Sequence, residues 1–299
     1  MRNKRSGWKG KLAAIFIIAC LAIYPALIIR SHNIPDAIPD TISSTVWADT
    51  RIGAAIDILE TEQNRWSFGL ADWHPQSRLT AMPAFQRGMA DTLSQFIALR
   101  AGLASTRGQA DQDLRLAASL IGQAISEGAD DQLFAATQAL RRHDGLIARG
   151  VLTQRTASEL LADETRLYAA LVEKSHSDLR AIIRAEDRRL FDATRTDVFY
   201  KVHGQLYVIG ALLKAGDTHE TGQSERSEAI AELEYRLDEA YRLSPLLVSN
   251  PAPGQFSFGG NDLMALAYML DDISLSLAEL TEILEAEQRT IVSGLAGRS

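Results

Sequence analysis

Eighteen consecutive residues without a charge, Leu12 to Ile29, constrain this chain more than any other feature. At about 1.5 Å of rise per residue, a helix of this length spans roughly 27 Å, close to the hydrocarbon thickness of a bilayer. Five cations precede the run, and only Arg30 follows it closely. This charge asymmetry predicts a single-pass transmembrane helix over residues 12–29, with residues 1–11 as a basic cytoplasmic tail and the remainder outside.

Two other interpretations of this segment stay open. A cleaved signal peptide shares the basic start, but its apolar core is usually about 7–15 residues long. A lipoprotein signal is the second, because Ile17-Ile18-Ala19-Cys20 loosely fits the residues before a lipidated cysteine. Apolar residues continue after Cys20, however, where a lipidated protein would have a polar tether. We therefore favour an uncleaved anchor that contacts the lipid bilayer through residues 12–29.

Charge is distributed unevenly along the chain. Residues 1–30 hold six of the 31 Lys and Arg and none of the 38 Asp and Glu, so residues 31–299 carry 25 cations against 38 acids, a formal charge of −13. An anionic domain repels phosphate backbones, so nucleic acid is not expected as a partner. The single cysteine, Cys20, lies in the apolar run, which rules out a disulfide within the outer domain.

The outer part of the chain has the pattern of an all-α, multi-helix bundle. Residues 30–44 contain two prolines and predict a loosely ordered linker; residues 45–288 form the helical domain, and 289–299 a flexible carboxyl-terminal tail. Apolar residues recur at helical spacing and no strand-like alternation is found. The expected helices cover about 46–64, 83–105, 109–126, 131–142, 154–191, 197–215, 224–243 and 261–288.

The last of these helices has the most regular pattern. Its leucines and one isoleucine alternate spacings of three and four over three heptads. This pattern predicts a helix packed within its own bundle, and leaves a homo-oligomer through the last helix as the alternative. The stripe consists of Leu263, Leu266, Leu270, Ile273, Leu277, Leu280 and Leu284.

Two connections are long for a helical bundle and carry aromatic residues where a solvated loop would be polar. They are residues 65–82 and 244–260. Aromatic side chains, tryptophan above all, are enriched at binding hot spots, so these loops hold the candidate binding residues. The alternative is that the tryptophans plug the end of the bundle and hold the loop down. The candidates are Trp66, Phe68, Trp73, His74, Asn250, Phe256 and Phe258.

Signatures of catalysis and metal binding are missing. Glu173 and His176 stand at the spacing of a di-iron ligand pair, but that site needs a second Glu-x-x-His, which the sequence lacks. His176 is better interpreted as a histidine at the edge of an apolar stripe. There is no HExxH, G-x-S-x-G or Gly-rich phosphate loop. We expect no cofactor and no metal, and an enzyme built from dispersed residues remains an alternative.

Three blocks of this sequence resemble a family of bacterial membrane proteins called domain of unknown function 2333. They are Phe85-Gln86-Arg87-Gly88, the segment from Tyr200 to Gln205, and the segment from Pro245 to Asn250. The chain departs from the family pattern at Gly260-Asn261-Asp262, where Pro-Asn-His would be expected. The resemblance implies a single-pass inner-membrane protein that faces the periplasm, and it implies no activity.

Together these observations predict a cell-envelope interaction or scaffold module. Its expected partner is an envelope protein or a cell-wall component bound through the two aromatic loops. The alternative is an envelope enzyme or a small-ligand sensor whose pocket lies between loops 65–82 and 244–260.

Overall fold

The computed structural model describes residues 34–39, 46–63, 65–67, 81–105, 111–127, 130–152, 157–185, 193–216, 224–245, 248 and 261–296. The expected basic tail and membrane anchor lie outside these ranges. Within them, no helix is both long enough and apolar enough to cross a bilayer.

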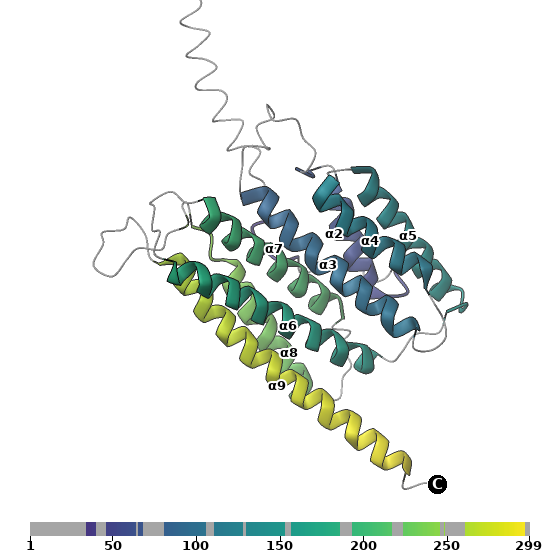
Figure 1. The fold of residues 1–299 in the computed structure, drawn as a ribbon. Coiled ribbons are helices and arrows are strands. Elements are labelled where there is room, and N and C mark those ends of the chain that lie inside the picture. Colours follow the sequence, from purple (N-terminus) through teal and green to yellow (C-terminus); the bar gives the residue numbers. More distant parts are fainter. Residues whose placement is uncertain are drawn as a thin grey trace, which may run out of the picture.

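The described residues form an all-α bundle of eight helices without a strand, as the sequence pattern predicts (Figure 1). Most helix ends fall within a few residues of the expected ones. Three differ more: the helix expected to reach residue 191 ends at Arg184, the one expected to end near residue 142 continues to Ala148, and the last one continues from the expected residue 288 to Ala296. The helices are α2 (Thr50–Gln63), α3 (Ala81–Ser105), α4 (Gln112–Glu127), α5 (Asp130–Ala148), α6 (Ala157–Arg184), α7 (Ala193–Gly216), α8 (Ser224–Tyr241) and α9 (Asp262–Ala296).

Helix α7 lies at the centre of the bundle, where its aromatic and apolar composition predicts it. Of its 24 residues, 16 are buried, so the helix is covered on nearly every side. It packs against α3 most extensively and also contacts α2, α6 and α8. Helices α2, α4 and α5 lie on the α3 side of the bundle, and α6, α8 and α9 form the other side (Figure 1).

Two ion pairs give the relative direction of α3 and α7. Arg87 pairs with Asp197 at 3.1 Å, and Asp91 pairs with Lys201 at 3.4 Å. Both partners advance by one helical turn from the first pair to the second, so the two helices run in the same direction. The amino-terminal half of α7 therefore lies beside the amino-terminal half of α3.

The leucine stripe of α9 is buried in its own chain. Ile273 and six leucines are at most 1% exposed, because α9 packs between α6 and α8. The helix continues to Ala296, which corrects the expectation of a flexible tail from residue 289. Its opposite face leaves three large apolar side chains in solvent, Met264, Tyr268 and Leu275.

The described part of the linker is packed against the bundle, which corrects the expectation of a loosely ordered segment. Ile38 is 2% exposed, and a Cβ atom added to Gly210 of α7 would lie 2.7 Å from its Cδ1. Ile34 packs at the edge of the same core. The carbonyl oxygen of Pro35 accepts a hydrogen bond from the Tyr241 hydroxyl at 2.7 Å. Two prolines limit the freedom of the unfolded segment, which lowers the entropy lost on docking.

Candidate functional site

Among the seven candidate binding residues, the described part of the chain includes Trp66 alone. The other candidates, Phe68, Trp73, His74, Asn250, Phe256 and Phe258, lie outside the described residues. Trp66 is 3% exposed, and its indole N–H donates to the carbonyl oxygen of Ala124 at 3.2 Å. Its ring is therefore part of the core, and it attaches the start of the first connection to α4. Direct contact between Trp66 and a partner is not compatible with this burial.

Gln86 of α3 holds the start of the first connection, residues 65–82, at Ser67, the residue after Trp66. Its side-chain oxygen accepts from the backbone N–H of Ser67 at 2.9 Å, and its nitrogen donates to the carbonyl of Arg65 at 2.9 Å. The same nitrogen donates to Glu62 at 3.1 Å. Burial raises the pKa of Glu62 despite the neighbouring Arg65. This stem, Glu62 to Ser67, is therefore held by a buried polar cluster that Gln86 completes.

An aromatic cluster connects this stem with the start of the second connection. Tyr207 of α7 lies 5.6 Å from Phe85 and 5.8 Å from Tyr241, measured between ring centroids. Tyr241 is the last residue of α8 and also lies 5.4 Å from the His203 ring. His203 stacks on Phe199 at 4.4 Å. Helices α3, α7 and α8 thus meet in one set of rings, and both long connections leave the bundle beside it.

The electrostatics of this cluster favour neutral side chains. Burial lowers the pKa of His203 to about 3 and raises that of Tyr207 to about 12. Burial also raises the pKa of Tyr241, with smaller contributions from Tyr207 and Glu62, and the pKa of Tyr200, with a contribution from Asp262. Neutral, buried rings do not act as general acids or bases on a substrate that they cannot reach. The cluster is part of the buried core, where α3, α7 and α8 meet.

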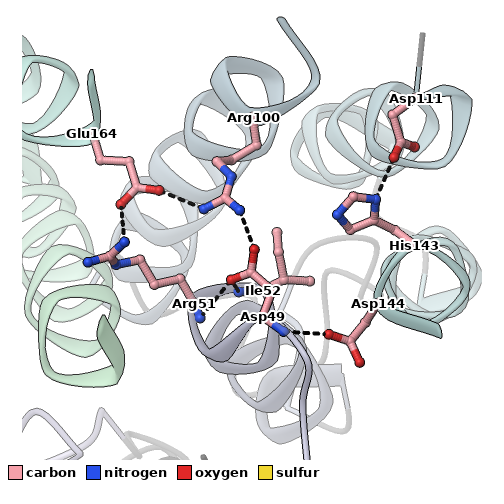
Figure 2. A network of polar contacts seen from close by, with 8 residues as sticks. All are labelled: Asp49, Arg51, Ile52, Arg100, Asp111, His143, Asp144 and Glu164. Atoms are coloured by element: carbon pink, nitrogen blue, oxygen red, sulfur yellow. Dashed lines mark hydrogen bonds and ion pairs between the residues drawn. The ribbon is translucent and has the colours of Figure 1, made fainter. Parts of the chain in front are cut away.

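A second polar network lies where α2 begins, and Figure 2 shows its side chains pointing toward one another. Arg100 of α3 pairs with Asp49 and, at 2.8 Å, with Glu164 of α6. Arg51 of α2 pairs with the other oxygen of Glu164 at 3.2 Å. All four side chains are at most 8% exposed, and the two cations balance the two anions. Burial lowers the pKa of Arg100, but Asp49 and Glu164 outweigh it and raise that pKa.

This network continues to α4 and α5. The backbone N–H of Asp49 donates to Asp144 at 2.8 Å, and the Asp49 carboxylate caps α2 by accepting from two backbone N–H groups, at 3.1 and 3.2 Å. His143, next to Asp144, bonds to Asp111, which caps α4 through the N–H of Leu114 at 3.0 Å. No sequence pattern predicts this network, because its members come from five separate segments and no local spacing marks them.

The Glu173–His176 pair does not form a metal site. His176 is buried, and its Nδ1 lies 3.3 Å from Asp271 of α9, whereas Glu173 is exposed. No group of three or more His, Cys, Asp and Glu side chains suited to a metal exists among the described residues. His176 lies at the contact between α6 and α9.

Comparison with known proteins adds no relative: no family model, no curated protein and no solved structure matches this chain. The resemblance to domain of unknown function 2333 has no support from these comparisons. Two of the three blocks that carry it, at Phe85–Gly88 and Tyr200–Gln205, lie against one another in the contact between α3 and α7.

Proposed function

We propose that this chain is an interaction or scaffold module of the bacterial inner membrane. In this proposal residues 12–29 anchor it, the amino terminus is cytoplasmic, and the helical domain lies in the periplasm. The loops at 65–82 and 244–260 bind an envelope protein or a cell-wall component. The apolar run, the acidic domain and the aromatic residues of the two loops support this assignment.

The docked linker is the observation that carries the proposal furthest. Ile34 packs on the core, and only five residue steps separate it from Ile29, the last residue of the apolar run. An extended chain covers at most about 3.6 Å per residue, so the docking point would lie within roughly 18 Å of the end of the anchor. The bundle would therefore be held close to the bilayer and would not swing on a long tether.

The same docking point lies beside the stems of both loops. Tyr241 donates to Pro35 of the linker, and it contacts Tyr207, whose ring packs on Phe85 next to Gln86. The two loops would thus be presented near the membrane surface from a rigid base. Loops on a rigid scaffold are common places for binding residues. A membrane-proximal or membrane-embedded envelope protein fits this geometry better than a distant cell-wall polymer.

A small-ligand sensor or enzyme with its pocket between the loops is the second candidate. One observation favours it: the Nε2 atom of His203 is buried and has no hydrogen-bond partner among the described residues. A ligand that offered an N–H or O–H donor to this nitrogen would satisfy it. The His203 ring is 3% exposed and lies 5.9 Å from the Tyr200 ring, measured between centroids, so the packing around this nitrogen would have to open for such a ligand to enter.

Photo-crosslinking in intact cells tests the proposal. A photoreactive amino acid replaces Trp73 or, separately, Phe258, with a matched probe at exposed Gln123 on α4 as control. We expect both loop probes to capture the same discrete envelope protein and the control to capture none. Absence of a captured protein at both loop positions, in a chain that is folded and inserted, would overturn the interaction module.

A further inference from the structure

Negative charge is concentrated on α8 and α9, which pack against one another on one side of the bundle (Figure 1). The two helices contain 13 acidic residues and three basic ones, a formal charge of −10. Residues 31–299 together carry −13, so two of the eight described helices account for most of that charge. The acidic character of the domain is therefore largely a property of this side.

Cations of neighbouring helices offset only part of this charge. Three of them form ion pairs of 3.0 to 3.4 Å with acids of α8 and α9, namely Arg166, Arg180 and Lys214. They offset at most three of the ten negative charges. Five exposed glutamates of the two helices have no ion pair with any described residue. These are Glu225, Glu228, Glu239, Glu279 and Glu282.

Exposed residues form one outward stripe on each of the two helices. Their spacings are three and four residues, which keeps the members of a stripe on a single face of the helix. The stripe of α8 consists of Glu225, Glu228, Glu232, Tyr235 and Glu239. The stripe of α9 consists of Met264, Tyr268, Asp272, Leu275, Glu279 and Glu282. Each stripe thus combines large apolar side chains with carboxylates.

Arg236 of α8 lies between the two stripes. Its guanidinium pairs with Glu232 at 2.7 Å and with Asp272 at 3.7 Å, one carboxylate from each stripe. Further along, Arg226 pairs with Glu287 of α9 at 3.3 Å. Residue numbers fall along α8 as they rise along α9, so the helices are antiparallel. The two stripes therefore lie side by side and form one surface, the α8–α9 face.

The side chains of the α8–α9 face define the chemistry of a partner. Tyr235, Tyr268 and Leu275 are between 60% and 68% exposed. Exposed tyrosines are common anchors at interfaces, and carboxylates without a partner beside them attract lysine and arginine. A second copy of this chain would instead bring the same negative charge to the contact, so charge disfavours self-association through this face.

We propose that the α8–α9 face binds an amphipathic, positively charged helix of another protein. A helix can pack along two neighbouring helices by placing its apolar stripe between them. That stripe packs on Tyr235, Tyr268 and Leu275, and lysine and arginine residues beside it pair with the five glutamates that have no ion pair within the chain. The face consists of helix surfaces and not of the loops at 65–82 and 244–260. It therefore goes beyond the proposed function and is tested separately.

Binding of a synthetic helix to the full chain tests this proposal. The probe is a fluorescent peptide of leucine and lysine whose leucines are spaced three and four residues apart. Its anisotropy is measured as the chain is added in micelles of a neutral detergent, and micelles without protein give the background. We expect saturable binding. A peptide with glutamate in place of lysine, and a scrambled peptide without an apolar stripe, should each bind at least about tenfold more weakly.

Substitutions on the face locate the binding site. Leu275→Asp should weaken binding of the leucine–lysine peptide at least about tenfold, because it places a charge in an apolar contact. Glu282→Lys should weaken it at least about threefold and should strengthen binding of the leucine–glutamate peptide. Asp131→Lys makes the same change of charge at an exposed residue of α5, on the other side of the bundle, and should leave both affinities unchanged.

Four results would overturn the proposal. One is the absence of saturable binding while circular dichroism shows a folded chain. Another is equal affinity for the leucine–glutamate or the scrambled peptide, because the face would then recognise only one of the two features. The third is binding that Leu275→Asp and Glu282→Lys leave intact. The fourth is a dimer, measured by light scattering, that Leu275→Asp converts to a monomer, because a second copy of the chain would then occupy the face.

Discussion

Gly88 of α3 and Gly204 of α7 bring two helix backbones into direct contact. A Cβ atom at Gly88 would lie 1.9 Å from the carbonyl oxygen of Lys201, and one at Gly204 would lie 1.9 Å from the carbonyl oxygen of Phe85. The contact is reciprocal, since each glycine faces the backbone of the helix that carries the other. Only residues without a side chain allow helices to approach so closely.

Replacing either glycine by alanine should therefore destabilise the bundle. For Gly88→Ala or Gly204→Ala we expect a loss of about 1–3 kcal/mol in the free energy of unfolding, because the added methyl group forces the central helices apart. Denaturant titration followed by circular dichroism measures this loss.

Gly102 on the same helix provides the matched control. A Cβ atom at Gly102 would meet nothing within 4 Å, so Gly102→Ala should stabilise the chain by about 0.4–1 kcal/mol through helix propensity. Equal effects at Gly88 and Gly102 would show that the two backbones are not in contact.

The sequence predicted the helices well because each buries one face at regular spacing. Helix α8 buries the apolar residues that recur at helical spacing along it, and α7 lies at the centre because it is apolar on nearly all sides. The buried network could not be predicted in this way. Arg51 and Arg100 look like ordinary surface cations in their own helices, and only the fold brings Glu164 within 3.2 Å of both.

The candidate site was harder to predict than the helices. Trp66 was a candidate binding residue, with a plug at the end of the bundle as the alternative, and its burial agrees with the alternative. Its indole N–H donates to a backbone carbonyl on α4, a contact between residues 58 positions apart. Long-range partners of this kind leave no local pattern in a sequence. Gly88 and Gly204 belong to two of the blocks that resemble a known family. Both lie where the backbones of α3 and α7 touch, which explains why each position is a glycine.

Removal of Arg100 tests the buried network. Arg100→Met removes one of the two buried cations that balance the negative charges of Asp49 and Glu164. We therefore expect a loss of about 3–5 kcal/mol in the free energy of unfolding. As a control, Arg141 pairs with Glu60 at the surface, where the side chains are 45% and 39% exposed. Arg141→Ala should cost less than about 1 kcal/mol. Similar costs for the two substitutions would contradict a buried network.

His203 should make stability depend on pH. Its pKa is lowered from 6.5 to about 3 in the folded chain, so the unfolded chain binds the proton first as the pH falls. Its contribution is complete above about pH 6.5 and is lost progressively toward pH 3, at up to about 1.4 kcal/mol per pH unit. Between pH 7.5 and 4.5 this loss amounts to roughly 2–3 kcal/mol.

The variant His203→Phe isolates this effect, because a phenyl ring preserves the stacking on Phe199 and does not titrate. The free energy of unfolding of both proteins is measured at the two pH values. From pH 7.5 to pH 4.5 the protein with His203 should lose roughly 2–3 kcal/mol in the free energy of unfolding relative to the His203→Phe variant. A constant difference would mean that His203 binds its proton equally well in the folded and unfolded chains.

Substitutions on the buried and the exposed face of α9 test folding and self-association separately. Ile273 is 0% exposed and Leu275 is 68% exposed, although only one residue lies between them. Ile273→Asp buries an unpaired charge and should unfold the bundle, whereas Leu275→Asp places the charge in solvent and should leave the free energy of unfolding within about 0.5 kcal/mol of the original. If the chain forms a homo-oligomer through the exposed residues Met264, Tyr268 and Leu275, Leu275→Asp should also reduce its mass in solution. Circular dichroism measures folding and light scattering measures mass for both variants. An Ile273→Asp chain that stays folded but loses its oligomeric state would mean that the leucine stripe is the interface between chains.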